Sequence, residues 1–293
     1  LLVSSAASDV YKRQGVNFFD NAEGYERGES EIVMGKALKS LNNPRDSYCV
    51  SSKVFFGAKE NPLPTQRGLS RKHITEACHQ AMERLQVDYL DLFFCHRADP
   101  ETPIGETVWA MHNLITQGKV LYWGTSEWTA EEITEAYEFA HSNNLSPPSM
   151  EQPQYNLLDR DRFENEYAPL YEKYGLGTTI WSPLASGALT GKYLDGVPKD
   201  SRASLEGYEW LRKSMVDSER GQERMKRITS LVPIAEKLET SLTKLAIAWC
   251  LLNKNVSTVI LGASKLDQLE ENLKSLDVLP LLDEKIQAEL QLI

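Results

Sequence analysis

The sequence has 293 residues, of which 41% are hydrophobic and 25% are charged, a balance usual for a globular enzyme. Lys and Arg number 32 against 42 Asp and Glu, so the net charge is −10. Because an acidic protein without a dense basic run is poorly suited to holding phosphate backbones, we expect no nucleic acid partner.

The first residues differ from the rest of the chain. Residues 1–14 read LLVSSAASDVYKRQ, begin without Met and stop where a strand-like pattern starts at Gly15. They lack the basic start and the continuous apolar core of a signal peptide, and they resemble translated adapter or vector sequence. We therefore expect residues 1–14 to be a non-native leader and residues 15–293 to form the domain.

Short apolar runs alternate with helical patterns from Gly15 to the end of the chain. The runs are nearly continuous in apolar residues, as in parallel strands that are buried on both faces. The expected strands are Val16–Asp20, Tyr48–Lys53, Leu90–His96, Val120–Ser126, Ser149–Tyr155, Gly177–Ser182 and Ser257–Gly262.

The segments between these runs have helical spacing. Two of them, Arg71–Leu85 and Lys265–Leu276, place their apolar residues on one face. Thr129 with Glu132 forms a capping-box pattern, which predicts the start of another helix. The connection over residues 183–230 is long and polar, and loops of that length are usually functional or disordered.

Strands that alternate with helices imply a parallel sheet, either closed into a barrel or open and doubly wound. Seven strand–helix repeats favour the barrel. An open dinucleotide-binding sheet should carry G-x-G-x-x-G after a strand, and the sequence has no such motif. Since barrels of this kind reach about 250 residues as one domain, we expect an α/β protein with a single (β/α)8 TIM barrel domain.

Polar side chains end or follow the first three runs. GVNFFD ends in Asp20 with Tyr25 in the next loop, YCVSSK ends in Lys53, and LDLFFCH ends in His96. Active residues of a barrel lie at the carboxyl ends of its strands. We therefore expect these four side chains to converge on one rim.

These residue types suit general-acid reduction of a small carbonyl substrate by a bound hydride donor. A tyrosine hydroxyl ordinarily has a pKa of about 10, and a nearby lysine cation favours its ionised form. A carboxylate beside the lysine keeps the lysine charged and oriented. A histidine at the mouth can hydrogen-bond the carbonyl oxygen of the substrate.

The other motifs and residue patterns give weaker evidence of function. GALTGK resembles a phosphate loop, but its spacing is one residue short and Tyr193 follows it in place of Ser or Thr. The scattered histidines and unpaired cysteines give no metal-ligand spacing, so we expect no metal. On the helix expected over residues 71–85, His73 and His79 occupy the polar face and should be solvated. Packing or pocket lining is the expected role of four tryptophans, Trp123, Trp128, Trp181 and Trp210.

The cysteines lie inside apolar segments and form no CxxC pair. We expect them to be small buried residues in a protein of the reducing cytoplasm. They are Cys49, Cys78, Cys95 and Cys250.

Several segments carry a family resemblance, namely GVNFFDNAEGYERGESEIVMGKAL, VSSKVFF, GLSRKHI, WGTSEW, WSPLASGALTGKY, SRASLEGYEWL, LAIAWCL and LGASKLDQLEENL. Together they resemble the aldo-keto reductase superfamily, in particular the branch of potassium channel β-subunits and their microbial and plant relatives. The D-x-x-x-x-Y pattern, followed by the strand-end Lys and by WSPLA-x-G, is specific in combination. The resemblance covers the chain from about Gly15 to its end.

The resemblance implies a catalytic tetrad of Asp20, Tyr25, Lys53 and His96, in which Tyr25 is the proton donor. It also implies a bound NADP(H). The implied contacts are Ser126 and Gln152 for the nicotinamide amide, Trp181 for the nicotinamide end, Ser182, Leu184, Ser186 and Gly187 for the pyrophosphate, Lys192 and Arg202 for positive charge, and Ser264, Gln268, Glu271 and Asn272 for the adenosine end. NADP is preferred to NAD because the hydroxyl of Ser264 and the cation of Lys265 suit a 2′-phosphate.

Three functions remain open from the sequence. The first is a cytoplasmic NADPH-dependent reductase of aldehydes or ketones, whose carbonyl substrate the sequence does not name. The second is a channel β-subunit that senses NADP(H), a branch that suggests a homo-tetramer and a membrane channel partner. Channel β-subunits of animals resemble this chain but carry Asn at the position of His96, which favours the enzyme.

The third possibility is a fragment without function. Full members of the resembled family begin with a hairpin, a first barrel strand and a helix, which residues 1–14 do not supply. Seven of eight strands would leave two unpaired edges. We therefore expect an incomplete barrel that lacks its first strand and helix, and a chain that is unstable or inactive where the complete gene product is active.

Overall fold

The computed structural model describes residues 15–199, 201–213 and 217–293. The expected leader, residues 1–14, lies outside the described residues. By internal contacts the chain forms two compact units. The first unit runs to residue 153 and includes residues 166–179 and 262–266, and the second comprises residues 154–165, 180–261 and 267–293.

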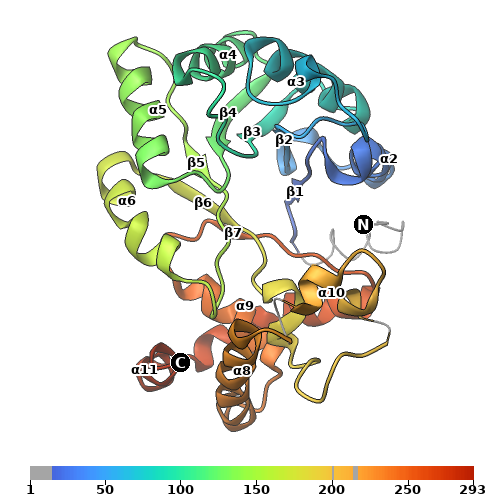
Figure 1. Cartoon of the computed structure of the whole chain (residues 1–293), viewed down its shortest axis with the longest axis vertical. Coiled ribbons are helices and arrows are strands. Elements are labelled where there is room, and N and C mark those ends of the chain that lie inside the picture. The colour runs from blue at the N-terminus through green and yellow to red at the C-terminus, as the bar shows by residue number, and fades with distance from the viewer. Residues whose placement is uncertain (1–14, 200, 214–216) are drawn as a thin grey trace. The chain divides into compact units, whose positions relative to one another are not determined.

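Among the described residues, seven short strands follow one another in the sheet in chain order, as the labels in Figure 1 indicate. The strands β1 to β6 pair in parallel, each with the next along the chain. The strands are β1 (Phe18–Asp20), β2 (Cys49–Val54), β3 (Leu90–Cys95), β4 (Val120–Thr125), β5 (Met150–Glu151), β6 (Gly177–Ile180) and β7 (Thr258–Val259).

Helices occupy most of the connections between strands. They are α2 (Glu29–Leu41), α3 (Arg71–Leu85), α4 (Ile104–Thr116), α5 (Ala130–Ser142), α6 (Ala168–Tyr174), α7 (Glu209–Arg212), α8 (Glu219–Lys237), α9 (Leu242–Leu252), α10 (Leu266–Leu273) and α11 (Glu284–Gln291). Parallel strands alternating with helices confirm the predicted (β/α)8 barrel class, of which the described residues carry seven strands.

Local sequence signals account for the ends of several helices. The bounds of α3 agree with the prediction, and its Ser70 cap accepts a hydrogen bond from the backbone N–H of His73 at 3.3 Å. The predicted capping box of Thr129 and Glu132 opens α5, with the Thr129 hydroxyl 3.2 Å from the Glu132 nitrogen. Both caps satisfy N–H groups that the first turn of a helix leaves without partners.

The core of the first unit lies where the helices cover the sheet. Phe93 and Trp123 on adjacent strands are fully buried, and Leu85 of α3 packs in the same cluster. The close approach of β4 to β5 requires a glycine, because a Cβ on Gly124 would lie 2.3 Å from the backbone oxygen of Met150. Any larger residue at position 124 would push these strands apart.

Six of the seven expected strands are longer than the observed ones, whereas β2 has the expected length and lies one residue later in the chain. The largest difference is β5, which ends at Glu151 where the apolar pattern extends to Tyr155. Pro153 has no N–H to give to a ladder, so the strand cannot continue through it. Beyond it, Gln154 pairs with Trp181 in an isolated bridge outside the named strands.

The polar connection over residues 183–230 contains more regular structure than the sequence suggested. Helix α8 begins within it at Glu219, and Arg224, Ile228 and Leu231 are buried along one face. The helix was missed because charged residues dominate its sequence. Its buried positions nevertheless recur at helical spacing.

Two predictions of burial are wrong. Cys49 is exposed, because it is the first residue of β2 and precedes the buried stretch of that strand, whereas the other three cysteines are buried. His73 is 4% exposed, because its ring bonds to buried groups described below, whereas His79 is exposed as expected. Trp123 and Trp128 are buried in the core, in agreement with a packing role, whereas Trp210 is 60% exposed and does not have that role.

Candidate active site

Three of the four predicted catalytic residues lie at the ends of neighbouring strands of the first unit. Asp20 ends β1, Lys53 is the second-last residue of β2, and His96 directly follows β3. The parallel registers align Asp20 with Ser51 and Lys53 with Phe94. The sheet therefore presents these side chains at one edge, as expected for the carboxyl ends of parallel strands.

Lys53 is the centre of the cluster and is fully buried. Its Nζ lies 2.5 Å from Asp20 Oδ2, 2.7 Å from the backbone oxygen of Asn21 and 3.4 Å from the Tyr25 hydroxyl. Burial opposes the charge of Lys53, but the Asp20 carboxylate and the Tyr25 hydroxyl outweigh it, and the pKa of Lys53 is raised. The lysine therefore stays protonated at neutral pH.

Asp20 is held by donors on both of its oxygens. While Oδ2 faces Lys53, Oδ1 accepts hydrogen bonds from the Ser51 hydroxyl at 2.6 Å and from Gln152 Nε2 at 3.1 Å. A buried carboxylate with this many donors keeps one orientation. Asp20 in turn fixes the direction of the Lys53 ammonium group.

Tyr25 differs from its partners in being 42% exposed. It opens the 3-10 helix η1 (Tyr25–Gly28), whose Glu26 and Arg27 adopt left-handed backbone angles, with φ of 47° and 57°. Such angles are uncommon for residues with a side chain and mark a loop with a defined shape. The loop leaves the ring of Tyr25 accessible while its hydroxyl points to Lys53.

His96 contacts the cluster through the ring of Tyr25. It is 7% exposed, and its ring stands edge to face with those of Tyr25 and Phe56, at centroid distances of 5.7 and 5.1 Å. Among the described groups, its buried Nδ1 has no hydrogen-bond partner. Burial, with the Lys53 and Arg97 cations, lowers the pKa of His96 from 6.5 to about 2. The imidazole is therefore neutral at physiological pH and able to donate one hydrogen bond.

This neutral histidine predicts a dependence of stability on pH. Between pH about 2 and 6.5 an unfolded chain binds a proton at His96 that the folded chain does not bind. Acid therefore favours unfolding, and the free energy of unfolding rises with pH across this window. We expect His96→Asn to reduce that rise, measured as urea midpoints at about pH 5 and about pH 7.

The exposed His79 offers a matched control for this measurement. His79→Asn should leave the difference between the two urea midpoints as it is in the parent chain. A His96→Asn variant that keeps the full parental difference would contradict the assignment of a neutral, buried His96.

Two of the expected nicotinamide contacts lie next to the cluster. Ser126 directly follows β4, and its hydroxyl donates to the backbone oxygen of Gln152 at 3.0 Å. The Gln152 carboxamide nitrogen donates to Asp20 and, at 3.2 Å, to the hydroxyl of Thr179. Both side chains are buried and are thereby held in place.

The second unit contains the loop with the expected pyrophosphate contacts. Ser182, Ser186 and Gly187 have φ of 57°, 56° and 90°, so this part of the loop is strongly curved. The Ser182 hydroxyl accepts a hydrogen bond from the Ser186 backbone N–H at 3.1 Å. A Cβ on Gly187 would lie 2.7 Å from Lys192 Nζ, so the glycine leaves room for a cation close to the backbone.

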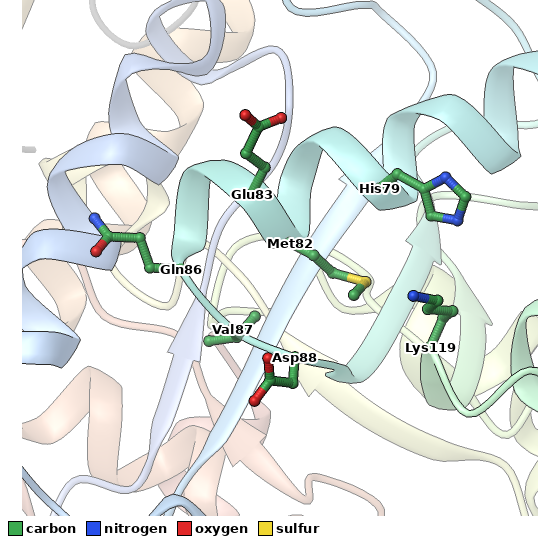
Figure 2. A pocket seen from close by; sticks show the side chains of 7 residues that line it. All are labelled: His79, Met82, Glu83, Gln86, Val87, Asp88 and Lys119. Atoms are coloured by element: carbon green, nitrogen blue, oxygen red, sulfur yellow. The ribbon is translucent and has the colours of Figure 1, made fainter.

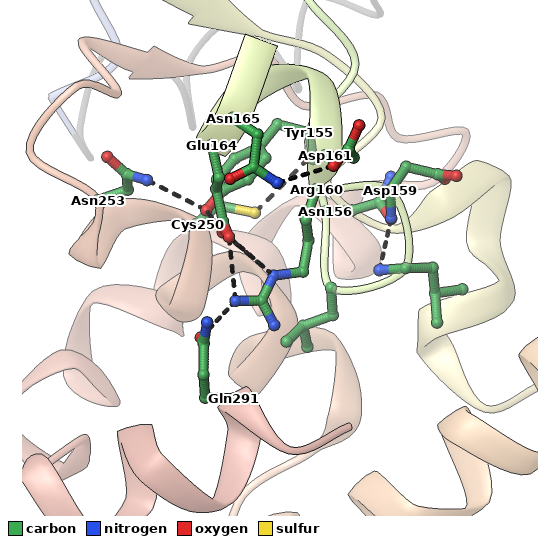
Figure 3. A network of polar contacts seen from close by, with 12 residues as sticks. Tyr155, Asn156, Asp159, Arg160, Asp161, Glu164, Asn165, Cys250, Asn253 and Gln291 are labelled. Carbon is green, nitrogen blue, oxygen red and sulfur yellow. Dashed lines mark hydrogen bonds and ion pairs between the residues drawn. The ribbon is translucent and has the colours of Figure 1, made fainter. Parts of the chain in front are cut away.

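A network of polar contacts lies in the same unit, and Figure 3 shows Tyr155, Asn156 and Glu164 within it. Asn156 is fully buried and donates to the Ser182 backbone oxygen at 3.0 Å, while its own oxygen accepts from the Leu158 and Asp159 backbone. The neighbouring Tyr155 hydroxyl donates to Glu164 at 2.8 Å. The start of the curved loop is therefore attached to a rigid part of the second unit.

The other expected cofactor contacts are distributed as follows. Trp181 pairs in a bridge with Gln154, and Leu184 precedes the 3-10 helix η5 (Ala185–Thr190). Arg202 begins the 3-10 helix η6 (Arg202–Ser204). On α10, Gln268 and Glu271 are exposed and Asn272 is buried, and the Glu271 carboxylate accepts from the Ser241 hydroxyl at 2.7 Å. Ser264 belongs to the first unit and is exposed.

Sequence reasoning missed several groups that complete the cluster. Ser51 donates to Asp20, and the backbone oxygen of Asn21 accepts from Lys53. The signal for Ser51 was present, because alternate residues of a strand face the same side, and Ser51 stands two positions before Lys53. A backbone oxygen carries no sequence signal.

A separate open pocket lies near the end of α3, and its volume is about 430 Å³. Figure 2 shows its lining, which consists of His79, Met82, Glu83, Gln86, Val87, Asp88 and Lys119. None of these residues is among the predicted site residues. The pocket is therefore distinct from the cluster around Lys53.

Two features are absent from the described part of the chain. Within it, no group of three or more His, Cys, Asp and Glu side chains is arranged to hold a metal ion. No helix there combines the length and apolar character that crossing a membrane requires.

Comparisons with known proteins agree with the fold. The Aldo/keto reductase family model matches residues 5–291. A rice protein (Oryza sativa subsp. japonica), named "Probable voltage-gated potassium channel subunit beta", is 50% identical over 283 residues, which cover 94% of this chain and 84% of the relative. An Arabidopsis thaliana protein of the same name is 49% identical over 270 residues, covering 92% of this chain and 80% of the relative. The chain belongs to the aldo/keto reductase family.

Proposed function

We propose that this protein is an NADPH-dependent oxidoreductase that reduces aldehydes or ketones to alcohols, with Tyr25 as the general acid. The observation that carries the proposal is the fully buried Lys53, whose ammonium group joins Asp20 to the Tyr25 hydroxyl. A buried lysine with a single carboxylate partner is costly to maintain, and such perturbed groups concentrate at functional sites.

In this proposal each side chain has a distinct task. Tyr25 is 42% exposed, so a substrate carbonyl oxygen can approach this side chain and take the proton of its hydroxyl. Lys53 stabilises the negative charge that then forms on the tyrosine oxygen. The neutral His96 donates a hydrogen bond to the carbonyl oxygen and orients it. Bound NADPH supplies the hydride that the carbonyl carbon receives.

The two units each offer groups that fit a dinucleotide. In the first unit, Ser126 and Gln152 would hold the nicotinamide amide, and Ser264 with Lys265 would hold the 2′-phosphate. In the second unit, the curved backbone at Ser186 and Gly187 beside Lys192 suits a pyrophosphate, because left-handed turns aim backbone N–H groups at anions. The roles of the remaining residues are those implied by the family, namely Trp181, Ser182, Leu184, Arg202, Gln268, Glu271 and Asn272.

The proposal is tested by NADPH fluorescence titration and by turnover of 4-nitrobenzaldehyde on the same samples. The parent in these measurements is the complete gene product, from which we expect binding and turnover. Lys192→Met should weaken NADPH binding about tenfold, because it removes the cation beside Gly187, and a tenfold change corresponds to about 1.4 kcal/mol. Lys199→Met, which removes another exposed lysine of the same unit, is the matched control and should bind as the parent does.

A parent chain that binds no NADPH would refute the proposed cofactor. Equal binding by Lys192→Met and the parent would remove Lys192 from the proposed pyrophosphate site.

All four cysteines are free thiols, which fits the reducing cytoplasm as the compartment of the proposed enzyme.

A second candidate function is favoured by the names of the two relatives. In this alternative the protein is a channel-associated subunit, a homo-tetramer that binds NADP(H) as a redox signal for a membrane channel. Tight NADPH binding without turnover, together with co-purification of a potassium channel, would favour it. Turnover that depends on Tyr25 would favour the reductase.

A further inference from the structure

Glu23 is a buried carboxylate in the segment that joins Asp20 to Tyr25, and it is only 3% exposed. Its Oε1 accepts hydrogen bonds from the backbone N–H groups of Phe55 at 2.7 Å and Gly57 at 2.9 Å. Its own backbone N–H donates to the Lys53 oxygen at 3.1 Å. Glu23 thus makes three hydrogen bonds to the segment that runs from Lys53 to Gly57.

These contacts join the two loops that carry the proposed proton donor and its lysine. Tyr25 follows Glu23 by two positions, and Phe55 follows Lys53 by two positions. Gly24 lies against the same loop, since a Cβ there would be 3.4 Å from the Phe56 Cβ. The distance between the Tyr25 hydroxyl and Lys53 Nζ therefore depends on how firmly Glu23 ties these loops together.

His73 of α3 supports the carboxylate from its other side. Its Nε2 lies 3.3 Å from Glu23 Oε2, and its Nδ1 lies 2.8 Å from the Gly68 backbone oxygen. Burial opposes protonation of His73, but the hydrogen bond and charge of Glu23 and the Gly68 oxygen outweigh it, so the pKa of His73 is raised. The carboxylate thus has a partner on each oxygen, as a buried charge requires.

We propose that Glu23 is a positioning residue for the activity proposed above, because its carboxylate oxygen ties the Tyr25 loop to the loop after Lys53. This inference rests on the proposed function. Glu23 acts through Tyr25 and Lys53 and does not itself touch the substrate. Its effect should therefore fall on kcat, while the KM for the aldehyde and the affinity for NADPH remain close to those of the parent.

Two conservative variants separate the reach of this side chain from its charge. Glu23→Gln keeps an oxygen at the same distance from the backbone, and its amide can donate to a neutral His73. Glu23→Asp keeps the charge but is one methylene shorter, so its carboxylate loses contact with the Phe55 and Gly57 N–H groups. Because small displacements of reacting groups can cost up to about 100-fold, we expect Glu23→Asp to lower kcat about 10- to 100-fold. Glu23→Gln should stay within about threefold of the parent.

The hydrogen bonds by which Glu23 holds the two loops together can be tested without cofactor or turnover. The measurement is amide hydrogen exchange of the peptide that contains Phe55 and Gly57. We expect exchange at these amides to be at least about tenfold faster in Glu23→Asp than in the parent, and close to parental in Glu23→Gln. Glu26→Gln changes an exposed acid of the same loop and is the matched control, with parental exchange and kcat.

Each outcome decides the inference. Faster exchange with a lower kcat, both restored in Glu23→Gln, supports it. Parental exchange in Glu23→Asp would show that Glu23 does not hold the two loops together. Faster exchange with a parental kcat would show that the contact between the loops is only structural. A Glu23→Gln variant as impaired as Glu23→Asp would overturn the role of the acceptor oxygen. If the parent chain has no turnover, the proposed function fails, and the exchange data still decide whether Glu23 holds the two loops.

Discussion

We expect Tyr25→Phe to lower kcat for aldehyde reduction by about 100- to 10,000-fold, the range over which a positioned general acid contributes. The substitution removes only the hydroxyl that lies 3.4 Å from Lys53 Nζ. The ring and its edge-to-face contact with His96 remain. The measurement is steady-state reduction of 4-nitrobenzaldehyde with saturating NADPH.

Two controls show whether the loss of turnover is specific to the Tyr25 hydroxyl. NADPH titration of Tyr25→Phe should give a dissociation constant within about twofold of the parent, because the hydroxyl serves proton transfer rather than binding. Tyr122→Phe removes another exposed hydroxyl of the first unit, 56% exposed on β4, and should keep parental turnover. If Tyr25→Phe retains more than about a tenth of the parental kcat, Tyr25 is not the general acid.

The second large effect is expected from Lys53→Met, on turnover and on stability together. The change leaves the Asp20 carboxylate, whose side chain is 7% exposed, without its cation. Removing one partner of a buried ion pair typically costs about 3–5 kcal/mol, because an uncompensated charge remains. We expect a loss of this size in the free energy of unfolding, measured by urea denaturation, and loss of turnover.

A double substitution separates the two effects. Asp20→Asn combined with Lys53→Met removes both charges, while an amide oxygen at position 20 can still accept from Ser51 and Gln152. Stability should return in large part, and turnover should not return. Lys72→Met is the matched control on an exposed pair with Glu76 and should cost less than about 1 kcal/mol. A Lys53→Met variant as stable as the parent would contradict the description of a buried, paired lysine.

The residues of the proposed tetrad could be identified from the sequence because each stands at a position that local patterns define. The apolar runs ending in Asp20 and Lys53 and the run ending in His96 correspond to β1, β2 and β3 within one or two residues. Parallel pairing then brings strand ends together without further information. Tyr25 lies in a loop, and its assignment depended on the D-x-x-x-x-Y pattern of the family.

Local signals also predicted helices whose ends have caps. The capping box of Thr129 and Glu132 and the single apolar face of residues 71–85 are properties of a few neighbouring residues. Helix α8 was harder to predict, because Arg224 is buried although it is a charged residue in a polar segment of the sequence. Its burial depends on the Asp159 carboxylate, which pairs with it from a distant part of the sequence.

The sequence by itself thus determined the alternation of strands and helices, the strand-end residues and the family. The tertiary structure alone decided which polar groups are buried and what they contact. His73 reads as a solvated helix residue, yet it is buried because Glu23 and the Gly68 oxygen satisfy both of its ring nitrogens. Gln152 reaches Asp20 across 132 positions of sequence. The physical reason is that a buried polar group is stable only with partners, and folding brings those partners from parts of the chain that sequence patterns do not connect.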